Sequence, residues 1–155
     1  MPDIQPFLKE LLSAPGLSGY EMPVSNIIAE KWKPLVDELS QSKIGSLHGL
    51  RKGSGPDPRP SVMIATHMDA IGLMVTGIAE GGFLRFTDVG GVDPRILPGQ
   101  PVTVHGREDL PGIVAQPSGR LLPPEVGDGT VPMEHLLIDT GLPPRKVAEL
   151  VQVGD

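Results

Sequence analysis

Residues 62–70 read VMIATHMDA, an uninterrupted apolar run that leads into a histidine and an aspartate. The run is bounded by Pro60 on one side and by His67 on the other. Short runs of this kind are typical of strands that are covered on both faces in a sheet flanked by helices. We therefore predict that residues 62–66 form the central strand of an α/β domain.

Two amphipathic helices are predicted before this strand. Apolar residues at positions 4, 7, 8, 11 and 12 follow the spacing of one helical face. Asp3 is expected to cap this helix, and Pro15-Gly16 to end it. Pro23 is tolerated in the first turn of the second helix, and Pro34 sets its expected end. The buried face of the second helix is expected to carry Val24, Ile27, Ile28, Trp32 and Leu35.

Two short strands are predicted between the helices and the apolar run. Residues 36–41 and 47–52 are expected to pair across a turn at 42–45. Residues 53–60, GSGPDPRP, have nothing to bury and are expected to form an exposed loop. The order helix, helix, strand, strand and central strand indicates the beginning of an α/β domain.

Beyond residue 70 the pattern changes to short strands separated by Gly and Pro turns. Residues 73–78 and 83–86 predict a β-hairpin, and further strands are expected at 102–104, 112–115 and 136–138. A helix is expected at 143–152. Short, closely spaced strands indicate a small barrel or sandwich. We place a boundary near residue 70, between an α/β unit at 1–70 and a β-rich unit at 71–155 with a C-terminal helix.

The composition argues against several classes of function. The net charge is −6 and aromatic residues make up 3% of the chain, whereas nucleic-acid binding needs a basic face or stacking platforms. The absence of cysteine excludes disulfides and thiol-ligated metals. The N-terminus lacks the apolar run of a signal peptide, and no stretch approaches the ~20 apolar residues of a membrane span. We therefore expect a cytoplasmic protein that binds neither membranes nor nucleic acid.

The strongest candidate for chemistry is the pair His67 and Asp69, at the end of the apolar run. Ligands bind at the carboxyl ends of strands in open α/β sheets. Residues two apart in an extended segment point the same way, so Asp69 can meet one ring nitrogen of His67 while the other nitrogen faces a metal ion. The spacing leaves a second interpretation open, in which the two form a hydrogen-bonded structural pair without a ligand.

Several motifs follow one another in order along the chain. They are GLSGYEMPV at 16–24, ATHMDAIGLMV at 65–75, GFLRFTDVGG at 82–91, DPRILPGQPVTVHG at 93–106 and LLIDTG at 136–141. Together they resemble the glutamyl-aminopeptidase/tetrahedral-aminopeptidase family of zinc metallopeptidases, some members of which are labelled endoglucanase or cellulase. The resemblance runs from about residue 7 to the end of the chain and corresponds to the N-terminal portion of the family.

The resemblance implies a metal-dependent aminopeptidase that hydrolyses N-terminal residues of short peptides through a metal-activated water. It implies that His67 is a ligand to one of two divalent metal ions, zinc or cobalt, and that Asp69 is the catalytic, orienting carboxylate. An acidic residue common in the family after this aspartate is replaced here by Ala70. The unit at 71–155 corresponds to a β-barrel inserted into the catalytic α/β domain, through which self-association is expected.

The remaining ligands that the family uses are not found in this sequence. A hydrolytic zinc site needs about three protein ligands, a water and a base, so this chain is expected to be inactive alone. One alternative is a non-catalytic β-barrel module for oligomerisation or binding. Another is a glycoside hydrolase (endoglucanase), which the shortage of Trp and Tyr and the lack of paired catalytic carboxylates disfavour.

Overall fold

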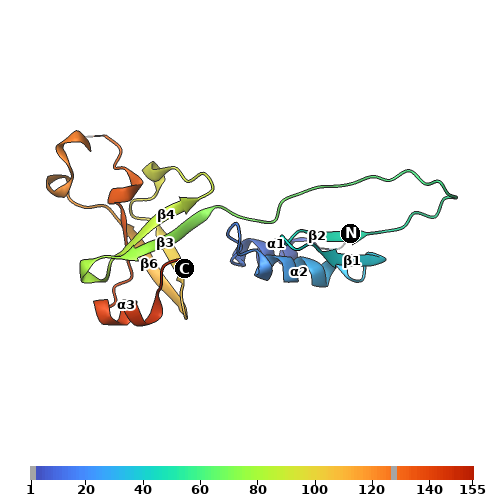
Figure 1. Cartoon of the computed structure of the whole chain (residues 1–155), viewed down its shortest axis with the longest axis horizontal. Coiled ribbons are helices and arrows are strands. Elements are labelled where there is room, and N and C mark those ends of the chain that lie inside the picture. The colour runs from blue at the N-terminus through green and yellow to red at the C-terminus, as the bar shows by residue number, and fades with distance from the viewer. Residues whose placement is uncertain (1–2, 127–128) are drawn as a thin grey trace. The chain divides into compact units, whose positions relative to one another are not determined.

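The computed structural model describes residues 3–126 and 129–155 and divides into two compact units (Figure 1). The first unit is Met1–Ala70 and the second unit is Ile71–Asp155. Together they make a mixed α/β protein. In the described ranges, no helix is long and apolar enough to cross a membrane. The assignment of the first unit to a catalytic domain and of the second to an inserted barrel stays a prediction.

The first unit begins with two helices, α1 at Gln5–Ser13 and α2 at Met22–Trp32. Asp3, the predicted cap of this helix, is not the N-cap residue, although its Oδ1 accepts the backbone N–H of Gln5 at 3.0 Å. Ile4, rather than Asp3, occupies the residue directly before the helix. Each helix carries a proline in its first turn, where the missing N–H costs no hydrogen bond.

The apolar faces of these helices are only partly covered. In α2, Val24 is buried, and Ile27, Ile28 and Trp32 are half-buried. The predicted burial of Leu35 was wrong: Leu35 lies beyond the end of α2 and is 58% exposed. In α1 no residue is buried, and the apolar side chains of Ile4, Leu8 and Leu12 are exposed.

A two-stranded antiparallel sheet follows, made of β1 at Glu38–Gln41 and β2 at Leu47–Leu50. Both strands lie inside the ranges predicted from the sequence, although each is shorter. The predicted turn is closed by the Ser42 N–H, which donates to the Ser46 carbonyl at 2.9 Å.

The prediction of a central strand at residues 62–66 was wrong for this chain. Residues 61–69 belong to no strand, and Val62, Met63 and Ile64 are 90%, 88% and 88% exposed. Figure 1 shows the connection after β2 as a long trace without an arrow. A strand needs hydrogen-bonding neighbours and a covering layer, and β1 and β2 pair only with each other. The loop at 53–60 is exposed, as predicted.

The second unit is built on a five-stranded antiparallel sheet in the order β3-β4-β7-β6-β5, counted over the described residues. The strands are β3 at Gly72–Ile78, β4 at Leu84–Val89, β5 at Pro101–His105, β6 at Asp109–Ala115 and β7 at Leu137–Asp139. The helix α3 spans Pro144–Leu150. Each of these elements overlaps a range predicted from the sequence. Short 3₁₀ helices lie in the connections at Glu80–Gly82, Pro94–Ile96, Gly119–Leu121, Pro124–Val126 and Met133–His135.

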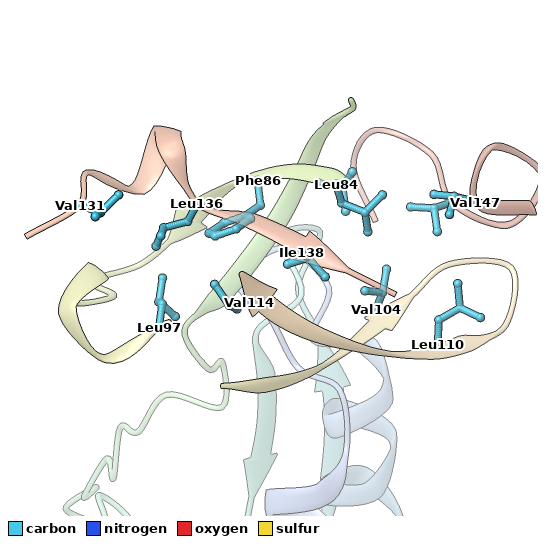
Figure 2. Packing of buried hydrophobic residues seen from close by; sticks show 12 residues of the cluster. Leu84, Phe86, Leu97, Val104, Leu110, Val114, Val131, Leu136, Ile138 and Val147 are labelled. Atoms are coloured by element: carbon cyan, nitrogen blue, oxygen red, sulfur yellow. The ribbon is translucent and has the colours of Figure 1, made fainter. Parts of the chain in front are cut away.

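Alternation along β4 shows how the sheet makes its core. Leu84 and Phe86 are buried while Arg85 between them is exposed, because successive residues of a strand point to opposite faces. The sheet curls into a half-barrel around a cluster of 12 buried residues (Figure 2). Gly82 lets α3 approach the β3–β4 turn, since a Cβ there would lie 3.0 Å from Pro144 Cα.

The C-terminal segment of the second unit lies against both ends of this sheet. The Leu150 carbonyl accepts the N–H of Arg107, in the β5–β6 connection, at 2.8 Å. Val75 in β3 donates its N–H to the Asp155 carbonyl at 2.8 Å and accepts the Gly154 N–H at 2.9 Å. The last residues of the chain therefore lie beside the strand with which the second unit begins.

Candidate functional site

The candidate site lies in the first unit, where the connection between α1 and α2 runs beside residues 67–70. Ala70 donates its N–H to the Gly16 carbonyl at 2.8 Å, and Leu17 forms an isolated parallel bridge with Ala70. Glycine is needed at position 16, because a Cβ there would lie 2.6 Å from Val24 Cγ2 of α2. The backbone thus brings together two segments that are about fifty residues apart in sequence.

The connection is shaped by a tight turn at residues 17–20, here called the Ser18 turn. The Tyr20 N–H donates to the Leu17 carbonyl at 2.7 Å and closes the turn. Gly19 has a φ of 90°, which glycine adopts without the steric cost of a Cβ. Its N–H donates to Glu21 Oε1 at 2.6 Å. Ser18 is therefore held in a defined backbone position.

The side chains of Ser18, Asp69 and His67 form a continuous hydrogen-bonded set. The Ser18 hydroxyl donates to Asp69 Oδ2 at 2.5 Å. The other carboxylate oxygen, Oδ1, lies 3.1 Å from His67 Nδ1, which also lies 3.1 Å from the backbone carbonyl oxygen of Asp69. A proton on Nδ1 satisfies this second contact and leaves Nε2 of the imidazole as a lone-pair atom. The structure thus brings the two predicted site residues together, while a metal-binding role for them stays a prediction.

Charge and exposure at this set suit a site that is open to a ligand. The hydrogen bond from Ser18, followed by that from His67, holds the pKa of Asp69 below its ordinary value. The carboxylate is therefore ionised at neutral pH and available as an acceptor. The side chain of His67 is 87% exposed, against 38% for Asp69, so the imidazole projects into solvent while the carboxylate lies closer to the protein.

One metal-ligand position fits these residues, but a complete site does not. A neutral imidazole whose Nδ1–H is held by a carboxylate is a common arrangement of a metal-binding histidine. Over residues 3–126 and 129–155, however, no three His, Cys, Asp or Glu side chains lie close enough to hold a metal ion. Ala70, next to Asp69, contributes no oxygen ligand from its side chain.

Sequence reasoning missed Ser18 as a member of this set. Its contact with Asp69 spans 51 residues, so no local spacing indicates it. The one available signal was the Ser18-Gly19 pair before α2, which predicts a turn but not the side chain that the turn presents.

Several charged pairs lie in the second unit, and two of them join residues two and four positions apart in sequence. Arg95 Nη2 contacts Asp93 Oδ2 at 2.6 Å. Hydrogen bonds from the side chain and then the backbone of Arg95 lower the pKa of Asp93 to about 2. His105 Nδ1 lies 2.8 Å from Asp109 Oδ1 across the β5–β6 hairpin.

Comparisons with known proteins all point in one direction. Residues 45–155 match the family model described as M42 glutamyl aminopeptidase. The lysyl aminopeptidase of Pyrococcus furiosus is 33% identical over 150 residues, which cover 92% of this chain and 41% of the relative. The crystal structure of a TET aminopeptidase from a marine sediment archaeon of the Thaumarchaeota has a TM-score of 0.86 and 34% identity, covering 97% of this chain and 42% of that chain.

A second solved structure adds information on assembly. The TET1 peptidase of Pyrococcus horikoshii has a TM-score of 0.80 and 32% identity, covering 99% of this chain and 45% of that chain. It is described as assembling into a tetrahedron or a large octahedral shell. The present chain spans about two-fifths of the length of the relatives that it matches.

Proposed function

The chain belongs to the M42 glutamyl aminopeptidase family, a family of metalloaminopeptidases, and on this basis we propose that it is the part of a metal-dependent aminopeptidase that carries the first metal ligand. The reaction is the hydrolysis of N-terminal residues from short peptides through a metal-activated water. The observation that carries the proposal is the exposed His67 imidazole whose Nδ1 is held by Asp69.

In this proposal His67 binds the metal through Nε2, and Asp69 fixes the orientation and tautomer of the ring. A carboxylate behind a histidine ligand also raises the basicity of the imidazole. The cofactor is a pair of divalent ions, zinc or cobalt, in each complete site. When bound, such ions supply Lewis acidity and lower the pKa of a water. This chain supplies one ligand, so the others come from the remaining length that the relatives possess.

The incomplete packing of the first unit supports this division of the site. The apolar run at 62–66 and the apolar face of α1 are both exposed, as expected for surfaces that other elements of a larger α/β domain cover. We propose that residues 62–66 become the central strand when those elements are present. His67 then lies at the carboxyl end of that strand, where ligands bind in open α/β sheets.

The second unit supports an insertion into such a domain. Asp155 is hydrogen-bonded to Val75 of β3, so residue 155 lies close to the strand with which the unit begins. This is the geometry that an inserted domain requires. We propose that the half-barrel mediates self-association, as the assembly of the Pyrococcus horikoshii peptidase suggests. The cytoplasmic location expected from the sequence stays a prediction.

A chimera tests the proposed function in the context of a complete site. Residues 1–155 replace the matching segment of the Pyrococcus furiosus lysyl aminopeptidase, and release of amino acids from peptides is measured with and without a chelator. We expect metal-dependent hydrolysis. His67→Ala should lower kcat/KM by about 100-fold, and Asp69→Asn by about 10- to 100-fold.

The matched control is His48→Ala, which removes an exposed histidine from β2 of the same unit and should leave the rate unchanged. Circular dichroism of each variant checks that the chimera is folded. A folded chimera that hydrolyses peptides equally well with His67 or alanine at position 67 would contradict the proposal.

A second candidate function is a non-catalytic module that associates through the half-barrel. It is favoured by the self-contained core of the second unit and by the missing ligand cluster in the part of the chain that the structure describes. The same chimera separates the two functions. An assembled, folded chimera without metal-dependent hydrolysis would favour the module.

A further inference from the structure

We propose that Ser18 is a positioning residue of this site, whose hydroxyl fixes the Asp69 carboxylate so that Oδ1 meets His67 Nδ1 and Nε2 stays free for a ligand. The inference rests on the proposed function, because it assigns Ser18 a role in preparing His67. The observation behind it is that the two oxygens of the Asp69 carboxylate have different partners. Oδ2 accepts a hydrogen bond from Ser18, and Oδ1 contacts His67.

Asp69 needs a second anchor because the side chain of its partner, His67, is largely exposed to solvent. The His67 side chain is 87% exposed, and a contact between two exposed, titratable groups is weak on its own. Residues 61–69 also belong to no strand that would fix the direction of the Asp69 side chain. A hydroxyl donor on Oδ2 restricts rotation of the carboxylate and directs Oδ1 toward the imidazole.

Ser18 is placed for this role by the backbone and not by its own contact. The Ser18 turn is closed by the Tyr20 N–H on the Leu17 carbonyl at 2.7 Å. The neighbouring Gly16 carbonyl accepts the Ala70 N–H at 2.8 Å. These backbone bonds hold the turn beside residue 70 whether or not the hydroxyl is present.

The hydrogen bond from the Ala70 amide to Gly16 distinguishes a positioning role of Ser18 from a purely structural one. If the hydroxyl merely fastened residues 67–70 to the turn, its removal would release the Ala70 amide along with Asp69. If Ser18 positions the carboxylate, its removal frees the Asp69 side chain while the Ala70 amide stays bonded to Gly16. The two possibilities therefore differ in two independent observables.

The experiment measures the tautomer of the His67 ring in this chain, without metal, by long-range proton–nitrogen NMR at about pH 8, above the ordinary histidine pKa of ~6.5. The His67→Gln variant assigns the signals. We expect the Nδ1–H form to dominate in the unsubstituted chain. Ser18→Ala should shift the ratio by about 2- to 10-fold toward the Nε2–H form, which is the effect of losing one hydrogen bond. The shift is partial because the backbone carbonyl oxygen of Asp69, also 3.1 Å from Nδ1, still accepts from Nδ1–H.

Matched variants keep the test decisive. Ser18→Thr retains the hydroxyl and should restore the ratio, whereas Ser18→Val has nearly the same shape without the hydroxyl and should behave like Ser18→Ala. Ser40→Ala, which alters an exposed serine of β1, should change nothing. An unchanged ratio in both Ser18→Ala and Ser18→Val would overturn the proposal. Loss of exchange protection at the Ala70 amide in these variants would overturn it as well, since the role would then be structural.

The outcome is distinguishable from failure of the proposed function. A tautomer shift in Ser18→Ala supports positioning even if the chimera hydrolyses no peptide. No shift overturns positioning even if hydrolysis by the chimera depends on His67.

Discussion

The second unit closes a core of its own, whereas the first unit leaves its most apolar stretch in solvent. The 12-residue buried cluster lies wholly in the second unit. In the first unit, Val24 is the one buried apolar residue among those that the structure describes. The half-barrel strands find partners within 85 residues of chain, residues 71–155. The run at 62–66 finds none, although it has the stronger strand pattern. An apolar strand pattern shows that a segment can form a buried strand. The strand forms only where neighbouring elements supply hydrogen-bond partners and a covering layer.

The largest expected effect comes from separating the two units. Residues 71–155 expressed alone should unfold cooperatively, because their buried cluster is complete. Residues 1–70 alone should show no cooperative transition, since almost no apolar side chain is buried there. Thermal unfolding followed by circular dichroism checks both. Cooperative unfolding of 1–70 would remove the contrast between the units.

A smaller effect is expected from matched truncations in the intact chain. Leu84→Ala deletes a fully buried side chain in β4 and should lower the free energy of unfolding by about 2–5 kcal/mol. Ile64→Ala deletes one that is 88% exposed and should change it by about 0.5 kcal/mol or less. Urea unfolding measures both. Equal costs would mean that residues 62–66 are packed in solution.

An alanine at Gly82, a glycine with a positive φ in the second unit, should have an intermediate effect on the free energy of unfolding. Gly82 has a φ of 85° and lies against Pro144, so Gly82→Ala should destabilise by more than about 1 kcal/mol. The half-buried Gly77 of β3, where a Cβ would meet nothing within 4 Å, serves as the control. If urea unfolding shows equal stability for the two alanine variants, the close approach of α3 to the β3–β4 turn is not needed.

The smallest effect is a pH dependence of the free energy of unfolding that arises from Asp93 in the second unit. Hydrogen bonds from Arg95 lower the pKa of Asp93 to about 2, so this carboxylate stabilises the folded state above its ordinary pKa of 3.8. The contribution is lost as the pH falls through about 2. Carbon NMR of the carboxyl group should give this midpoint. In Asp93→Asn the stability lost between about pH 4 and pH 2 should diminish, and an unchanged profile would refute the assignment.

Much of the fold follows from local signals in the sequence. The hairpin of β3 and β4 follows from two strand-like runs on either side of the turn at Glu80-Gly81-Gly82, and α1 follows from its apolar spacing. These features are set by residues within a few positions of one another. The failures at Leu35 and at 62–66 have the opposite cause, because burial of those side chains depends on elements that must pack against them.

In the candidate site, too, one part follows from local sequence and the other depends on residues that are distant in sequence. The pairing of His67 with Asp69 follows from their spacing in an extended segment. The contribution of Ser18 depends on a turn 51 residues away in sequence. It also depends on Gly16, because the lack of a Cβ there allows the backbone to lie close to Val24 of α2. No pattern near Asp69 contains that information. The sequence therefore indicates His67 and Asp69, and the fold adds Ser18, whose hydroxyl donates to the Asp69 carboxylate.

The metal content of the chimera tests the central claim most directly. The chimera of residues 1–155 with the remainder of the lysyl aminopeptidase is dialysed against zinc, and bound zinc per chain is measured by elemental analysis with His67 or alanine at position 67. We predict about two ions per chain with His67 and the loss of at least one with alanine. Equal zinc content in the two folded proteins would show that His67 is not a ligand and would contradict the account.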